Sequence, residues 1–159
     1  MGGLAVYLCA AVASLGLSSH QEKRACRYMP IIIKESIRRN IDPELLIGLI
    51  FVESSFNPWA KSHAGACGLT QVIPKYTGKY SPVKKYSCAQ LKNPYTSIRA
   101  GAKIFSWWIN YHNGNVERAL CGYSSGFRCK GKKPLRAGIR YAKKVLKITT
   151  VIKKKLITK

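Results

Sequence analysis

Apolar side chains recur along the first half of this chain at helical spacing. Ile33, Ile37 and Ile41 lie four residues apart, and basic residues lie between them. This pattern predicts an amphipathic helix that starts at about residue 28 or 30 and ends at Asn40.

The segment 43–56 is apolar nearly all round, which indicates a helix buried on most of its surface. Asp42 followed by Pro43 is typical of a helix N-terminus, with aspartate as the N-cap and proline at the first helical position. Pro58 is expected to stop the helix. We therefore predict that 43–56 is the central helix of the domain.

Two further helices are predicted, one from residue 94 to about residue 109 and one starting at Val116. Between them and the central helix, residues 59–91 are rich in Gly, Ser, Pro, Tyr and Lys. This composition predicts a long loop, with room for a short helical turn after Gly68, and long loops in compact domains usually carry function. The expected architecture is mainly α, with little or no strand.

The N-terminal segment, Gly2 to Leu17, is apolar or small and carries no charge. Its length suits the core of a signal peptide and is short for a membrane span. Ala11-Val12-Ala13 has the form of a cleavage site, although no Lys or Arg precedes the apolar run. An uncleaved membrane anchor and a buried helix are the alternatives. The first two interpretations export the domain.

Charge adds information about the partner. The 159 residues include 28 Lys and Arg but only 6 Asp and Glu, a formal net charge of +22. Such an excess favours a polyanionic partner. Composition by itself does not decide between nucleic acid and an anionic cell wall or membrane surface.

Cysteine use agrees with export, because the expected pairs would close loops in an oxidising compartment. The predicted pairs are Cys67–Cys88 and Cys121–Cys129, which leaves Cys26 over, and the sixth cysteine lies in the apolar N-terminal segment. Free thiols in a reducing compartment are the alternative. No pair has the two-residue spacing of a zinc knuckle, so no metal is expected. No cofactor is expected either.

Glu53 is the acidic residue with no structural explanation. Its upstream helical neighbours Leu49 and Ile50 would desolvate it and offer no cation, which would raise its pKa and suit a general acid. Glu35, in contrast, lies four residues before Arg39, the spacing of an ion pair on a helix surface. The other acidic residues lie in a polar stretch or at helix starts: Glu22, Asp42, Glu44 and Glu117.

The residues that follow Glu53 resemble the catalytic segment of lytic transglycosylases of the soluble (SLT) type. That family shows Glu-Ser, Phe-Asn-Pro, Ser-x-x-Gly-Ala-x-Gly-Leu-Met-Gln and then proline. The matching positions are Glu53, Ser54, Phe56, Asn57, Pro58, Ser62, Gly65, Ala66, Gly68, Leu69, Gln71 and Pro74. Thr70 departs from the motif, since the family usually has methionine there.

Weaker similarities continue toward the C-terminus. Asn93, Pro94, Ile98, Ala100 and Gly101 match a further family segment, and 122–126 resembles the family's Ala-Tyr-Asn-Ala-Gly, with serine at 124 in place of asparagine. Residues 140–145 resemble the family's closing helix.

The resemblance implies a goose-type lysozyme-like catalytic domain over residues 25–147. Residues 1–19 would precede it as signal peptide or anchor, and 148–159 would follow as a basic tail.

The resemblance also implies residue roles. Glu53 would be the catalytic acid and base. Ser62 and Gln71 would contact the substrate, the hydroxyl of Tyr123 would reach Glu53, and Tyr141 would border the active site. Trp59, Trp107 and Trp108 are expected in the core rather than as sugar platforms.

The implied function is cleavage of the β-1,4 bond between N-acetylmuramic acid and N-acetylglucosamine in peptidoglycan, with a 1,6-anhydro product. A lysozyme-type hydrolase on the same bond and a non-catalytic cationic polyanion-binding protein are the alternatives. The expected location is exported: periplasm, cell envelope or virion. The partners are glycan strands, with a secretion, conjugation or phage-entry assembly as a further option, and no specific nucleic acid.

Overall fold

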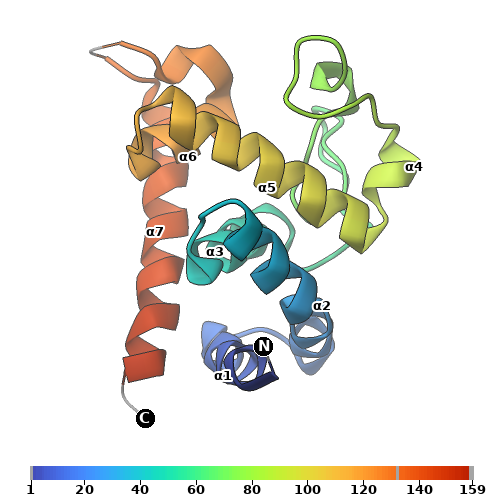
Figure 1. Ribbon diagram of the computed structural model, residues 1–159, viewed down its shortest axis with the longest axis vertical. Helices are drawn as coiled ribbons and strands as arrows, with labels where there is room; N and C mark the ends of the chain where they lie inside the picture. Colours follow the sequence, from blue (N-terminus) through green and yellow to red (C-terminus); the bar gives the residue numbers. More distant parts are fainter. Residues whose placement is uncertain (1, 132, 158–159) are drawn as a thin grey trace.

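The computed structural model describes residues 2–131 and 133–157, and its regular elements there are helices (Figure 1). Short 3-10 helices are labelled η. In chain order the elements are α1 (Gly2–Val12), η1 (Ala13–Leu15), α2 (Ser19–Arg38), α3 (Pro43–Ser54), η2 (Pro74–Tyr76), α4 (Cys88–Leu91), α5 (Pro94–Tyr111), α6 (Val116–Ser125), η3 (Gly126–Cys129) and α7 (Arg136–Ile157). Strand-like pairing in this part of the chain is limited to two isolated bridges within 61–72. The mainly α prediction is confirmed.

Helix α3 is the central element, as its apolar sequence predicts. Leu46, Ile47, Leu49 and Ile50 are fully buried, and α2 and α7 pack against the helix on different sides (Figure 1). The helix begins at Pro43 and ends at Ser54. It therefore carries Glu53 in its last turn, directly after the buried apolar turns of the helix.

Helices α3 and α7 run antiparallel and lie unusually close. Lys153 binds Asp42 at one end of α3 (2.6 Å), while Tyr141 contacts Glu53 at the other. Between these ends, a Cβ on Gly48 would lie 2.8 Å from Thr149 Oγ1 and 3.1 Å from the Val145 carbonyl oxygen. The missing side chain at Gly48 thus permits the close approach that holds the two helices in register.

Helix α2 starts nine or more residues before the predicted position. Ser18 and Gln21 form a capping box: Ser18 Oγ accepts from the Gln21 amide, and Gln21 Oε1 accepts from the Ser18 amide. The capping box starts the helix at Ser19, and Pro30, expected near the helix start, therefore lies in the helix interior. The helix ends at Arg38, close to the expected end.

The apolar N-terminal segment folds onto the domain as α1. Leu8 and Val12 are fully buried, and α1 packs against α2 and α7. Across the described residues, none of the helices combines the length and the apolarity needed to traverse a bilayer.

At the other terminus, residues 148–157, predicted as a basic tail, continue α7 and bury Thr149 and Ile152. Lys159, part of the same prediction, lies outside the described residues.

Three disulfides link the six cysteines. Cys67–Cys88 and Cys121–Cys129 form as predicted, whereas the expectation that Cys26 is left over is wrong. Cys26 bonds Cys9, because α1 turns back along α2 and brings the two cysteines together across a separation of 17 residues.

The Cys67–Cys88 bond should stabilise the domain more than Cys121–Cys129, because it closes 21 residues rather than 8. Loop-closure entropy predicts losses of about 3.3 and about 2.5 kcal/mol in the free energy of unfolding. Replacing each pair with alanine, followed by urea denaturation without reductant, measures both losses. An unchanged free energy in the Cys67→Ala/Cys88→Ala variant would contradict a bond in this loop.

Candidate active site

Glu53 is a largely desolvated carboxyl group, and among the described residues its hydrogen bond comes from Tyr141. The hydroxyl of Tyr141, on α7, donates a hydrogen bond to Glu53 Oε1 (2.5 Å). Burial raises the pKa of Glu53 from its ordinary value of 4.5 to about 7, and the bond from Tyr141 opposes part of that rise in pKa. A carboxyl group with such a pKa exchanges a proton readily near neutral pH.

The α3–α7 packing places Tyr141 beside Glu53. Burial, followed by the negative charge of Glu53, raises the pKa of the Tyr141 hydroxyl well above its ordinary value. The hydroxyl therefore stays protonated and acts as a fixed donor, and a donor of this kind favours the ionised carboxylate. Tyr141 thus borders the acid, in agreement with the position expected for it.

The chain after Glu53 turns back sharply toward the helix end. Ser55 and Phe56 adopt positive φ angles of 47° and 60°, and the Phe56 side chain is fully buried. The hydroxyl of Ser54 donates to the Leu69 carbonyl oxygen (2.8 Å), which ties the last turn of α3 to the loop. The motif residues around Glu53 are therefore structural neighbours as well as sequence neighbours.

Gly68 and Gln71 shape the returning loop. Gly68 has φ 79°, and a Cβ there would overlap the Leu91 carbonyl oxygen, so only glycine fits. Gln71 has φ 50°, and its Nε2 donates to the Ala60 and Gly68 carbonyl oxygens at 3.2 and 2.9 Å. The Gln71 amide group thus braces the loop that carries it.

Ser62 closes a second turn of the same loop. Its Oγ accepts a hydrogen bond from the Ala66 amide (3.0 Å), and the Ser62 amide donates to the Ala66 carbonyl oxygen (3.0 Å). This is the turn-capping arrangement. The Ser62 hydroxyl retains its own proton for a further bond.

Thr70, the position that departs from the family motif, is fully buried and organises the loop against α5. Its Oγ1 donates to the Ser97 carbonyl oxygen (2.8 Å), and its amide donates to Ser97 Oγ (3.1 Å). A Cβ on Gly101 would overlap the Thr70 side chain. We did not predict this role from the sequence, although the exchange of methionine for a residue with a hydroxyl group was the available signal.

The hydroxyl of Tyr123 bonds a different partner from the one expected. It donates to the Thr70 carbonyl oxygen (2.7 Å), so the predicted bond to Glu53 is wrong, and Tyr141 provides that bond instead. Tyr123 is on α6, whose packing directs its ring onto Phe105 and its hydroxyl into the loop. It still lies near Glu53, whose charge contributes to the raised pKa of Tyr123 after the larger effect of burial.

The other acidic residues occupy structural positions. Glu35 pairs with Arg39 as predicted (3.1 Å), but it is fully buried rather than on a helix surface, because Arg99 of α5 also covers it (3.7 Å). Asp42 binds Lys153 and makes no side-chain capping bond. The remaining three lie in first turns of helices: Glu22, Glu44 and Glu117. Among the described residues, no cluster of three or more His, Cys, Asp or Glu side chains could hold a metal.

The tryptophans differ in their environment. Trp108 is buried, as expected, but Trp107 is 37% exposed and Trp59 is 69% exposed, which contradicts a core position for both. Trp107 lies on a solvent-facing side of α5, where it stacks on Tyr111. Trp59 follows Pro58 in the loop after α3, outside the helical packing, and Lys92 Nζ lies 5.8 Å from its ring centroid.

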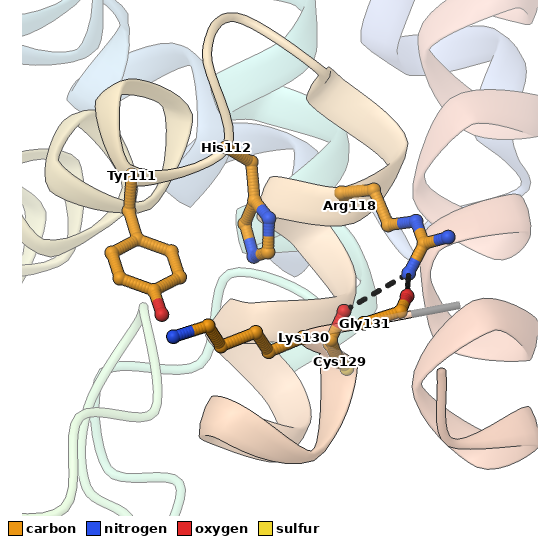
Figure 2. Close-up of a pocket in the computed structure, with 6 residues that line it drawn as sticks. All are labelled: Tyr111, His112, Arg118, Cys129, Lys130 and Gly131. Carbon is orange, nitrogen blue, oxygen red and sulfur yellow. Dashed lines mark hydrogen bonds between the residues drawn. The ribbon is translucent and has the colours of Figure 1, made fainter. Parts of the chain in front are cut away.

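A cavity of about 440 Å³ lies where α5, α6 and η3 meet, away from the residues predicted for the site (Figure 2). The Arg118 Nη1 donates to the carbonyl oxygens of Cys129 (3.1 Å) and Gly131 (2.8 Å), which closes one side. Figure 2 shows Tyr111 and His112 facing Lys130 across the cavity. These groups brace the segment after α6 and belong to no predicted functional set.

Comparison with known proteins assigns the fold. Two solved structures share it: the lytic transglycosylase Slt of Pseudomonas aeruginosa, as an inactive mutant (TM-score 0.69, 25% identity), and the 70 kDa soluble lytic transglycosylase of Escherichia coli (TM-score 0.66, 19% identity). Each match covers 80% of this chain and 24% of the other. The lysozyme-like helical fold of these lytic transglycosylases is therefore confirmed for this chain.

Curated relatives point the same way. The chain is 41% identical over 95 residues to the membrane-bound lytic murein transglycosylase C of Glaesserella parasuis serovar 5 (strain SH0165), covering 57% of this chain and 26% of the relative. It is 46% identical over 98 residues to the protein of that name from Haemophilus influenzae (strain PittEE), covering 58% and 27%. This chain thus spans about a quarter of the length of these relatives.

The family model described as the transglycosylase SLT domain matches residues 30–146. That range is most of the chain, and it includes α3, the loop that follows it, and the tyrosines on α6 and α7. The chain belongs to the transglycosylase SLT domain family.

Proposed function

We propose that this domain cleaves the β-1,4 bond between N-acetylmuramic acid and N-acetylglucosamine in peptidoglycan, as a lytic transglycosylase. The observation that carries the proposal is Glu53: a desolvated carboxyl group with a pKa of about 7, held by Tyr141 within the family's motif. The names of the relatives, lytic murein transglycosylases, support the same reaction.

Glu53 acts first as an acid and then as a base. With a pKa of about 7, a large fraction of Glu53 is protonated near neutral pH and can donate to the oxygen of the leaving sugar. Once Glu53 has given up its proton, the hydrogen bond from Tyr141 stabilises the carboxylate, which then accepts a proton from the attacking group.

The nucleophile comes from the substrate. A retaining glycosidase needs a second carboxylate at ~5–5.5 Å and an inverting one at ~6.5–9.5 Å. On α3, Glu44 precedes Glu53 by nine residues, which is about 13 Å along the helix, and the other acids have the structural positions given above. The 6-hydroxyl of the muramic acid residue can attack its own anomeric carbon, with the advantage of proximity. The product is a 1,6-anhydromuramyl end.

The polar loop residues line the path of the glycan in this proposal. Ser62 donates its free hydroxyl proton to a sugar, and Gln71, braced through its Nε2, presents its carbonyl oxygen. Tyr123 acts through the loop, since its bond to Thr70 holds the residue before Gln71. Tyr141 contacts the acid itself.

The domain acts in the cell envelope, where its substrate is found, and the name "membrane-bound" of the relatives supports that location. We infer that α1 stays with the mature domain rather than being removed as a signal peptide. Its buried Leu8 and Val12 and its disulfide to α2 make it part of the core, and removal would expose the surfaces of α2 and α7 beneath it.

The Glu53→Gln variant should lose ~10²–10⁴ in rate on purified sacculi, because an amide cannot donate the proton. Wild-type protein should release muropeptides lighter by one water than the products of a hydrolase, as measured by mass spectrometry. Glu44→Gln makes the same change at the other end of α3 and should retain activity. Reducing-end products would identify a lysozyme-type hydrolase, and full activity of Glu53→Gln would remove Glu53 from the mechanism.

Glu53 should also make stability depend on pH. Because its pKa is raised from 4.5 to about 7 on folding, the folded protein binds more protons than the unfolded chain between these values. The free energy of unfolding therefore falls by up to about 3 kcal/mol as pH rises through this window. Glu53→Gln should lack this fall, so its advantage over wild type in urea denaturation should be larger at pH 8 than at pH 4. An advantage independent of pH would show an ordinary pKa.

Retention of α1 is tested by the mass of the protein recovered from the envelope of the producing cell. We expect a chain that still contains residues 2–17 and, after digestion without reductant, a peptide pair joined through Cys9 and Cys26. A mature N-terminus after Ala13 would contradict the inference.

A further inference from the structure

A second cavity, of about 250 Å³, lies where the end of α2, the first half of α5 and the loop at 83–86 meet. In Figure 1 these three segments lie side by side, with α5 between the loop and α2. Neither Glu53 nor any other residue of the proposed active site lines this cavity. It is a separate feature of the surface.

Four of the lining side chains are cations, supplied by all three segments: Arg39, Lys84, Arg99 and Lys103. No acidic residue is among the described lining residues. Lys84 and Lys103 are exposed to solvent, and the Arg99 side chain is 55% exposed, so a ligand can reach the charges from outside.

One buried carboxylate lies behind the two arginines. Glu35 is fully buried, with Oε2 3.1 Å from Arg39 Nη2 and Oε1 3.7 Å from Arg99 Nε. Glu35 thus forms ion pairs with both guanidinium groups at the junction of α2 and α5, although neither of its oxygens makes a hydrogen bond. It balances only one of the four positive charges, and the two lysines have no counterpart in this arrangement.

The two arginines, Arg39 and Arg99, have more N–H donors than the Glu35 carboxylate can accept from. Each guanidinium carries five N–H groups, and Arg39 Nε is buried without a hydrogen-bond partner. Because Arg39 Nε lies below the surface, an anion in the cavity would meet the remaining N–H groups, including those of the half-exposed Arg99. Cations held by a buried acid, with unpaired donors among them, are features of a built anion site rather than of a solvated charge run.

The remaining lining residues define the shape of the site. Val83 and Ala100 are buried and form an apolar base, and Tyr86 adds an aromatic wall, with Lys84 Nζ 5.6 Å from its ring centroid. Guanidinium groups bind tetrahedral phosphate oxygens in pairs, whereas lysines supply point charges. The volume admits a phosphate together with part of the group that it esterifies.

We propose that this cavity binds a phosphate group, either free inorganic phosphate or the phosphodiester of an anionic lipid headgroup. The site lies outside the glycan-cleaving machinery and does not depend on the proposed function. Such a site would hold the domain to a phosphate-bearing surface through fixed contacts, in addition to the diffuse attraction of its net charge of +22.

Binding of inorganic phosphate is measured by calorimetry at constant ionic strength, with sodium chloride as the balancing salt. The test variant is Lys84→Gln/Lys103→Gln, which leaves both ion pairs of Glu35 intact. The control is Lys143→Gln/Lys144→Gln, which removes the same charge from the exposed face of α7. Wild type and control should bind alike, and the test variant at least about tenfold more weakly, because two charge-assisted contacts are lost. Amide shifts on titration should change at 83–86 and 99–103.

The two sources of phosphate are separated with phosphatidylglycerol vesicles. Vesicle binding that is weakened in the test variant more than in the control, and inhibited by inorganic phosphate, assigns the site to a headgroup. Phosphate binding without such vesicle binding assigns it to the free anion. Equal phosphate affinity in test and control variants, or no binding to wild type above the chloride baseline, would overturn the proposal. Circular dichroism spectra confirm that each variant is folded.

Discussion

The antiparallel packing of α3 on α7 is the constraint on which the rest of this domain depends. At Gly48 the two helices approach so closely that a Cβ would contact the α7 backbone and the Thr149 side chain. This contact fixes the axial position of one helix on the other. With Lys153 bound to Asp42 at one end, the other end can only bring Tyr141 to Glu53. The acid therefore has its hydrogen-bond donor because of packing contacts a turn or more away.

The loop after α3 has little regular structure, yet it is held at many points. Ser54 binds the Leu69 carbonyl oxygen, Thr70 binds Ser97 on α5, and Tyr123 on α6 binds the Thr70 carbonyl oxygen. The Cys67–Cys88 bond closes the same segment. Three helices and one covalent link thus position a loop whose own backbone bonds form only turns and isolated bridges in the part of the chain that the structure describes.

Five of the six acidic side chains have structural positions, whereas Glu53 has none. The carboxylates of Glu35 and Asp42 bind arginine or lysine, and three more acids lie where helix dipoles favour them. Glu53 is set apart in a chain of net charge +22, since its polar contact is the neutral hydroxyl of Tyr141. A lysine or arginine in that place would hold the carboxylate ionised and lower its pKa, which would remove its ability to donate a proton near neutral pH.

The sequence by itself determined the central helices and singled out the candidate acid, but it misplaced the start of α2 and the end of α7. Periodicity predicted the amphipathic face around Ile33 and Ile37 and the buried rod of α3, because both depend on local spacing alone. Elimination among six acids singled out Glu53, since its lack of a charge partner can be recognised from its sequence neighbours. Two disulfides were also predictable, because each closes a single loop between neighbouring elements.

Only the tertiary structure decided which elements meet. Three features depend on how helices cross: the pairing of Cys9 with Cys26, the burial of Glu35 beside Arg99, and the hydrogen bond that Glu53 accepts from Tyr141 instead of Tyr123. A helical pattern shows that one face is apolar, but the same apolar face can pack against any other. Which hydroxyl reaches Glu53 depends on a close approach at Gly48, some five residues away along α3, and no local pattern contains that information.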